Sequence, residues 1–174
     1  PVDNGKEEAQ QNPDANGNAW FVNEVQYVKT ANEEIKALDS LNTKKVAILK
    51  GHNSYGLEDS RKYDIDSLAT IKLTKYSLNA LSYESFSNQN GFAVFSEIYY
   101  KDGWNAYIDG ELKPYLNVNY VLRGLEIPAG KHSIEFRFEP KVIQTGSTIS
   151  LLSYVFLLLI PLGWFFYDKN KATQ

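Results

Sequence analysis

The stretch from Ser133 to Glu139, "SIEFRFE", has the clearest alternation in the chain and indicates a β-sheet protein. Its apolar members are Ile134, Phe136 and Phe138, and the charged members are Glu135, Arg137 and Glu139. Because successive side chains of a strand point to opposite faces, this period of two predicts a strand between a core and water.

Similar short segments before this strand predict several more. They are "TIKLTKYS", "ALSYESFS", "GFAVFSEIYY", "WNAYI" and "ELKPYLNVNYVL", all between Thr70 and Leu122. "GFAVFSEIYY" is apolar on both faces, as expected of a central strand. Asp109-Gly110 favours a type I′ turn, and "IPAGKH" marks a second turn. The pattern predicts a mainly β protein with an antiparallel β-sandwich or jelly roll.

The first third of the chain has a different pattern. Residues 1–18 are polar and predict a linker, whereas residues 19–51 predict a strand, a helix and a strand. Thr30 and Glu33 fit a capping box at the start of the helix. We therefore expect a small N-terminal strand-helix-strand element, followed by the sandwich over residues 52–147.

The segment from Ile149 to Tyr167 contains no charged residue. A helix of that length rises roughly 28 Å, close to the hydrocarbon thickness of a bilayer. Trp164 and Tyr167 near its end suit a membrane interface, and Pro161 is tolerated in membrane helices. The sequence predicts a transmembrane helix over residues 148–167 and a polar tail over residues 168–174. The alternative is a helix buried in a soluble core.

Composition excludes several classes of function. The net charge is −3 and no cluster of Lys or Arg is present, so we expect no binding to nucleic acid. There is no Cys to form a disulfide or a thiolate ligand, and His52 and His132 lie far apart without ligand-like spacing. We predict neither a metal site nor a cofactor.

No catalytic residue is predicted either. Acidic residues gather in sequence around one predicted hairpin: Glu97, Asp102, Asp109 and Glu111. Asp109 is already needed in the turn, and Glu97 fits a strand face, so an acid/base pair is not favoured. The chain also lacks a glycine-rich phosphate loop and a nucleophile elbow.

The same hairpin is rich in aromatic rings and amides, which together suit carbohydrate binding. The candidate residues are Tyr107, Asn105, Tyr115, Asn117 and Asn119. Alternation places Trp104 on one face of its strand, with Asn105 and Tyr107 on the other. If the Trp104 face is the core, these two residues make the sugar contacts. The alternative is that the aromatic rings only pack in the sandwich.

Three ordered motifs resemble one known family. They are "GNAWFV" from Gly17, "FSEIYYKDGWNAYIDG" from Phe95 and "VNYVLRGLEIPAGKHSIEFRFEP" from Val118, with the hydrophobic helix after them. The set resembles the C-terminal end of YfhO-like bacterial membrane proteins, in forms common in Bacteroidetes. The likeness covers most of the chain from Gly17 onward.

This resemblance implies a multi-pass protein of the GT-C type, which moves sugars from polyprenyl-phosphate donors at the bacterial cytoplasmic membrane. The chain would be its extracytoplasmic domain and last membrane helix, with residues 168–174 in the cytoplasm and an N-terminal transmembrane region missing. The family's presumed catalytic acidic residues lie in that missing region. The expected function is an accessory domain that holds an envelope glycan as acceptor; the alternatives are a structural domain without a small ligand and, less favoured, an independent hydrolase.

Overall fold

The computed structural model describes residue 12, residues 14–51 and residues 60–171, with the side chains of all of these except residue 144 and residues 165–171. The chain divides into two compact units. Unit 1 extends to Tyr99 and continues over Asn105–Arg137, whereas unit 2 comprises Tyr100–Trp104 and the chain from Phe138 onward. Each unit is described by itself.

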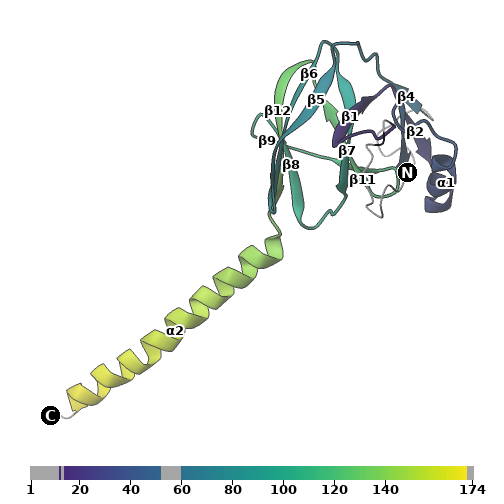
Figure 1. Ribbon diagram of the computed structural model, residues 1–174. Coiled ribbons are helices and arrows are strands. Elements are labelled where there is room, and N and C mark those ends of the chain that lie inside the picture. Colours follow the sequence, from purple (N-terminus) through teal and green to yellow (C-terminus); the bar gives the residue numbers. More distant parts are fainter. Residues whose placement is uncertain (1–11, 13, 52–59, 172–174) are drawn as a thin grey trace, which may run out of the picture. The chain divides into compact units, whose positions relative to one another are not determined.

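Two β-sheets form the framework of the protein (Figure 1). The seven-stranded sheet has the order β1 (Ala19–Val22), β7 (Gly91–Ile98), β11 (Leu122–Ile127), β10 (Leu116–Val118), β3 (Val46–Lys50), β2 (Glu24–Val28) and β4 (Ser60–Lys62). The five-stranded sheet has the order β5 (Thr70–Ser77), β6 (Ala80–Ser87), β12 (Gly130–Phe138), β8 (Trp104–Ile108) and β9 (Glu111–Lys113). The predicted mainly β, sandwich-like fold is confirmed.

Three aromatic rings join the two sheets. Tyr83 of β6 and Phe136 of β12 both contact Phe95 of β7, with ring centroids 4.9 Å apart in each pair and edge-to-face geometry. All three rings are almost completely buried. Such pairs contribute about 0.5–1.5 kcal/mol each beyond the burial of their area. The alternation predicted for β12 is confirmed, because Ile134 and Phe136 are buried while Glu135 and Arg137 are half-buried.

The seven-stranded sheet is curled rather than flat. β1 and β2 are separated in the chain only by Asn23, yet β1 lies at one end of the strand order and β2 near the other. A second core fills the curl: Val22, Val25, Ala47, Tyr63, Phe92, Val94 and Val118. Gly124 of β11 leaves room for this packing, since a Cβ there would lie 2.5 Å from the Phe92 ring.

The N-terminal strand-helix-strand element is built into this sheet. β2 and β3 pair in parallel, and α1 (Ala31–Leu38) connects them, as parallel strands need a crossover. The predicted capping box is present: Glu33 N donates to the Thr30 side chain, and the Glu33 carboxylate accepts from Thr30 N. The next residue, Glu34, is buried and accepts a hydrogen bond from Tyr120 N at 2.9 Å. This bond fixes α1 to the turn between β10 and β11.

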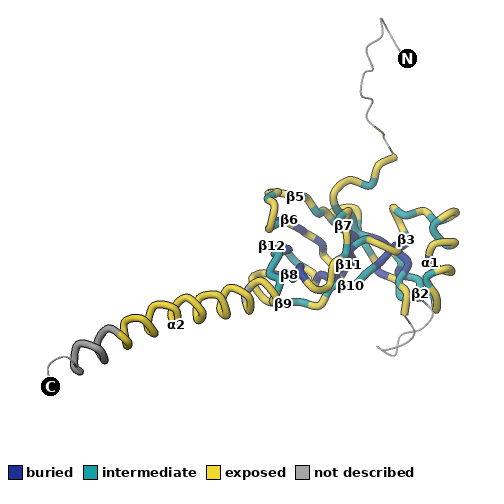
Figure 2. The backbone as a smooth tube through the Cα atoms, turned by 90° about the horizontal axis from the view of Figure 1, so that it is seen from below, coloured by how far each residue is buried: buried dark blue, intermediate teal, exposed yellow. Residues whose placement is uncertain are grey.

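Unit 2 contains the long helix α2 (Lys141–Lys171). Within its segment Lys141–Trp164, a window of 18 residues has a mean hydropathy of 1.8 and is not buried, so the helix is long and apolar enough to cross a membrane. The residues of α2 whose burial is described are exposed (Figure 2). The helix begins at Lys141 and includes the polar residues after Pro140, while the bounds of the membrane-spanning part, residues 148–167, stay a prediction. In the same unit the Trp104 and Phe138 rings pack 5.4 Å apart.

Candidate functional site

The structure places Tyr107 and Asn105 together on the outward face of β8. Ala106 and Ile108, which alternate with them, are buried, so this part of the predicted strand orientation is correct. The guanidinium carbon of Arg137 lies 4.4 Å from the centroid of the Tyr107 ring, and Arg137 is also ion-paired with Glu135. One face of the Tyr107 ring is therefore covered by a cation rather than open to a sugar.

The other three predicted residues belong to the framework of the fold. The Tyr115 ring packs 5.0 Å from Tyr99 and 5.6 Å from Phe136. Asn117 is half-buried in β10, and its Oδ1 atom is buried. The Asn119 side chain accepts a hydrogen bond from Ile48 N at 2.8 Å, and its backbone N donates to Ile48 O at 2.8 Å. Asn119 thereby links the end of β10 to β3.

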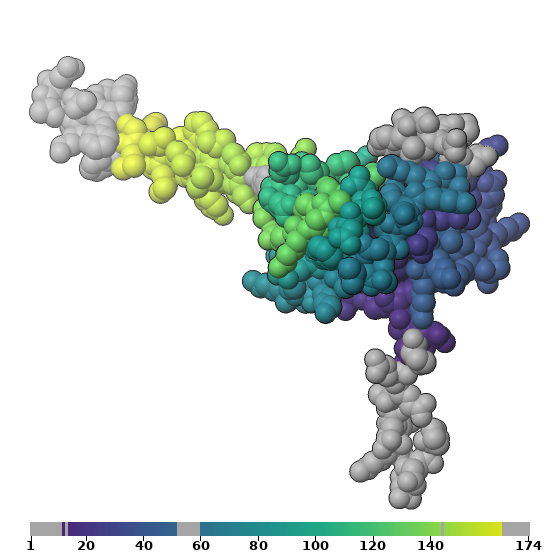
Figure 3. Space-filling view, turned by 90° about the horizontal axis from the view of Figure 1, so that it is seen from above, coloured from purple at the N-terminus to yellow at the C-terminus, as the bar shows by residue number. Residues whose placement is uncertain are grey.

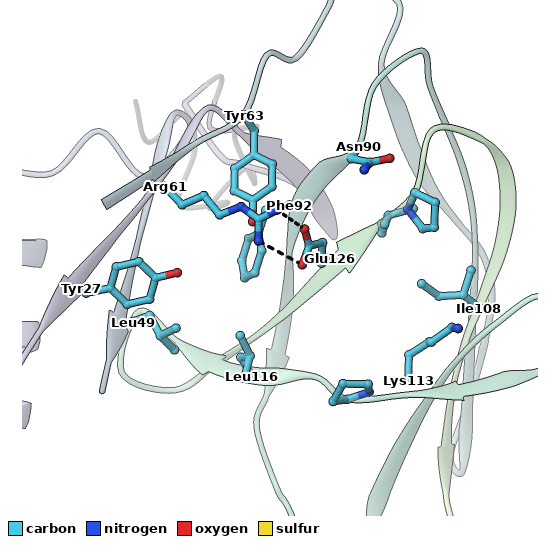
Figure 4. Close-up of a pocket in the computed structure, with 13 residues that line it drawn as sticks. Tyr27, Leu49, Arg61, Tyr63, Asn90, Phe92, Ile108, Lys113, Leu116 and Glu126 are labelled. Carbon is cyan, nitrogen blue, oxygen red and sulfur yellow. Dashed lines mark hydrogen bonds and ion pairs between the residues drawn. The ribbon is translucent and has the colours of Figure 1, made fainter. Parts of the chain in front are cut away.

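A cleft of about 590 Å³ lies elsewhere in unit 1, where both sheets contribute side chains (Figure 4). Its lining residues are Tyr27, Leu49, Arg61, Tyr63, Asn90, Phe92, Ile108, Lys113, Pro114, Leu116, Glu126, Ile127 and Pro128. None of the five residues predicted from the sequence lines it. Concave, mainly apolar sites with a few placed polar groups are the usual form of ligand sites.

The charged centre of the cleft is an ion pair between Arg61 of β4 and Glu126 of β11. Arg61 Nη2 lies 2.8 Å from Glu126 Oε1, and Nη1 donates to Oε2 at 3.4 Å. The guanidinium carbon also lies 5.1 Å from the Tyr63 ring centroid. Both charged side chains are partly exposed, and both line the cleft. The ion pair therefore offers a ligand the hydrogen-bond donors of Arg61 next to the acceptor oxygens of Glu126.

Two tyrosines supply the aromatic part of the wall. Tyr27 is half-buried, and burial raises the pKa of its hydroxyl, with Arg61 opposing the shift and Glu126 adding to it. Burial raises the pKa of Tyr63 to about 12, with a further contribution from Glu126. Both hydroxyls therefore stay protonated at neutral pH and can donate hydrogen bonds. Asn90 and Lys113 add an amide and an ammonium group to the lining.

The arrangement offers binding groups rather than a catalytic pair. Glu126 is the cleft's carboxylate, and it is held by Arg61. Among the acidic residues considered in the sequence, Asp109 accepts from Ser133 N at 2.9 Å, and Glu111 is paired with Lys113 at 2.8 Å. Positive φ angles at Asp109 and Gly110, 52° and 83°, confirm the predicted type I′ turn.

Of the two histidines, His132 lies within the described residues. His132 Nδ1 lies 2.6 Å from Asp109 Oδ2, and Nε2 lies 3.2 Å from Ala129 O. His52 lies outside the described residues. Within the described residues, no group of His, Asp or Glu side chains is placed to hold a metal ion.

Two buried charged residues were not anticipated from the sequence. Arg123 of β11 is almost fully buried, donates from Nε to Ile98 O at 3.0 Å, and lies 5.0 Å from the Phe136 ring centroid. Burial lowers the pKa of its guanidinium. Glu34 is the second buried charged residue. In an amphipathic helix a charged residue is expected on the solvent side, so the sequence does not predict its burial.

Comparison with known families identifies the group to which the chain belongs. Residues 4–150 match the model of the family described as bacterial membrane protein YfhO. The chain belongs to the YfhO family. The match covers the YfhO sandwich and confirms the resemblance seen in its motifs. No curated protein and no solved structure matches the chain. Family membership and the apolar helix α2 together indicate that this YfhO protein is membrane-associated.

Proposed function

We propose that the sandwich is an extracytoplasmic accessory domain of a multi-pass YfhO membrane protein, and that its cleft holds an acceptor glycan of the cell envelope. The parent protein would transfer a sugar to that glycan from a polyprenyl-phosphate donor. The cleft at Arg61 and Glu126 carries the binding part of this proposal.

The chemistry of the cleft suits a sugar. A pyranose ring has apolar C–H faces and a rim of hydroxyl groups, so it needs flat apolar surface next to paired donors and acceptors. The half-buried Tyr27 supplies a ring and a hydroxyl, while Arg61 donates and Glu126 accepts. Because the ion pair holds both charged groups in place before binding, little side-chain entropy is lost when hydroxyls dock on them.

The role in glycosyl transfer rests on the resemblance to GT-C-type proteins. The position outside the cytoplasmic membrane rests on the same resemblance, because the charges next to the helix do not decide its orientation. Arg137 and Lys141 precede the apolar run, and Lys169 and Lys171 follow it. Two basic residues on each side leave the positive-inside rule undecided. The cleft supports only the binding of a ligand.

A glycan-array screen of the full chain in lipid nanodiscs tests the proposal. The array carries oligosaccharides of bacterial envelopes, and the variants are Glu126→Gln and Glu135→Gln. Glu135 is the matched control, because it also pairs with an arginine on a strand and is about as exposed as Glu126. Neither substitution changes the size of the side chain.

We expect the unmodified chain and Glu135→Gln to bind the same set of glycans. Glu126→Gln should weaken binding about 10-fold or more, since a hydrogen bond to a charged group contributes about 1.5–3 kcal/mol. A folded chain that binds no glycan would contradict the proposal and favour a structural domain without a small ligand. Equal loss in both variants would place the glycan outside the cleft.

A further inference from the structure

Exposed apolar side chains gather at one end of unit 1, which we call the apolar end. Its members are Tyr76 and Leu78 of the β5–β6 hairpin, Ile98 at the end of β7, and Val121 before β11. Their exposed fractions are 66%, 92%, 71% and 46%. An isolated exposed apolar residue needs no explanation, but a cluster of them marks an interaction surface.

The strand register shows that these residues share one end. Ser77 pairs with Ala80 at the tip of the hairpin, and Ala80 pairs with Arg137 near the end of β12. The turn between β6 and β7 lies at the opposite end, where β6 ends and β7 begins. Ile98, at the last position of β7, therefore lies at the same end as the first residue of β6. Val121 is beside it, because Tyr99 N donates to Val121 O at 2.7 Å.

The opposite end of the sandwich differs in character. Its turns are Asn88–Asn90, Asp109–Gly110 and Pro128–Gly130, which present mainly amide, carboxylate and backbone groups. Three large apolar side chains near this end are also exposed among the described residues: Leu68 before β5, Phe86 of β6 and Leu112 of β9, with exposed fractions of 62%, 38% and 63%. The three most exposed large apolar side chains of unit 1, Leu78, Ile98 and Tyr76, nevertheless lie at the apolar end. The β5, β6 and β12 surfaces adjoin one another in Figure 3.

The chain leaves unit 1 at the apolar end. Only Glu139 and Pro140 separate β12 from α2, so the start of α2 lies within roughly 10 Å of the last β12 residue. A helix over Lys141–Trp164 rises about 36 Å, more than the ~30 Å of bilayer hydrocarbon. Lys141 therefore lies in the headgroup layer or next to it when α2 crosses the membrane. This holds for either orientation of the helix.

We infer that the apolar end is a membrane-contacting surface, which inserts Tyr76 and Leu78 among the lipid headgroups. Tyrosine suits this layer because its ring is apolar and its hydroxyl is polar. The exposed Lys75 next to Tyr76 matches the negative charge of anionic lipids. The β5–β6 hairpin is then an attachment of the sandwich to the bilayer in addition to the covalent link through α2. The inference does not depend on glycan binding.

Site-specific labelling of the full chain tests this contact. The chain has no Cys, so single cysteines can carry an environment-sensitive fluorophore without removing native thiols. The test variant is Leu78→Cys. The matched control is Gln89→Cys, which lies in an exposed turn at the other end of β6. Both are placed in nanodiscs of phosphatidylethanolamine and phosphatidylglycerol, with a nitroxide quencher on the upper acyl chain of some lipids.

We expect several-fold stronger quenching at position 78 than at position 89, and a blue-shifted emission at position 78 only. Because both positions are exposed turns, folding is not at risk from either label. An unquenched label at position 78 would overturn the inference and leave the apolar end to a polypeptide partner. Equal quenching at both positions would also overturn it, since lipid contact would then be unspecific.

Discussion

Arg61 and Glu126 form an ion pair, with Nη2 and Oε1 2.8 Å apart, although β10, β3 and β2 lie between their strands in the sheet order. Neighbouring strands are about 4.8 Å apart, so a flat sheet would separate β4 and β11 by roughly 19 Å. The curl of the seven-stranded sheet brings them together, and the cleft forms where the curled sheet meets β8 and β9.

The ion pair itself should contribute little to stability. Both side chains are partly exposed, and such pairs are worth about 0–1 kcal/mol. We expect Glu126→Gln and Glu135→Gln to lower the thermal midpoint by similar small amounts in detergent. A drop of many degrees for Glu126→Gln alone would show that the pair holds the curl, and any loss of glycan binding would then reflect misfolding.

The buried Glu34 should matter more for local stability. Glu34→Ala removes the acceptor of Tyr120 N in a partly buried hydrogen bond, and the loss of such a bond costs about 0.5–1.5 kcal/mol. Glu34→Gln retains a side-chain oxygen and should cost less. Hydrogen exchange of the Tyr120 amide reports on this contact directly. Unchanged protection of that amide in Glu34→Ala would refute the assignment.

The pair of His132 and Asp109 should make stability depend on pH. The hydrogen bond between them is the main cause that raises the pKa of His132 and lowers the pKa of Asp109. The His132 contribution is fully present below its ordinary value of 6.5 and is lost as pH rises through the folded value. The Asp109 contribution is present above 3.8 and is lost as pH falls through its lowered value.

The stabilising effect of the pair is thus greatest between pH 3.8 and pH 6.5. We expect the difference in thermal midpoint between the unmodified chain and His132→Gln to peak in that range and to shrink on both sides. Asp109→Asn should give the same profile, since Asn tolerates the positive φ angle of the turn. A difference that is constant from acid to alkaline pH would rule out the charged pair.

The hydroxyl of Tyr83 should be dispensable, unlike its ring. The ring contacts Phe95 and Phe136, while the buried hydroxyl has no hydrogen-bond partner among the described residues. Burial of this group raises the pKa of Tyr83. Tyr83→Phe should therefore leave stability unchanged or raise it, whereas Tyr83→Ala should cost about 3–5 kcal/mol. A large loss in Tyr83→Phe would reveal a bound water or another partner for the hydroxyl.

Local patterns predicted local structure well. The alternation around Phe136, the Thr30–Glu33 capping box and the Asp109-Gly110 turn are all present, because each depends on residues close together in the chain. The uncharged run after Ile149 likewise predicted an apolar helix. The helix itself begins earlier, at Lys141, because the uncharged polar residues before Ile149 are helical as well, and polarity alone does not mark the end of a helix.

The cleft was not predictable in the same way. Tyr27, Arg61 and Glu126 are distant in the chain, and only the curl of the sheet brings them together. The sequence instead directed attention to aromatic and amide residues that are adjacent in the chain. Of these, Tyr115 and Asn119 are parts of the framework, because a short connection between paired strands must bond its own polar groups. No spacing rule separates such residues from ligand-binding ones.

The most direct test of the central claim is hydrogen exchange of the full chain in nanodiscs, with and without a glycan that the array identifies. We predict slower exchange confined to the cleft strands, at Tyr27, Arg61 to Tyr63 and Glu126, and no such change in Glu126→Gln. Slower exchange around Asn105 and Tyr107 on β8 instead would contradict the account and place the sugar on the outer face of the five-stranded sheet.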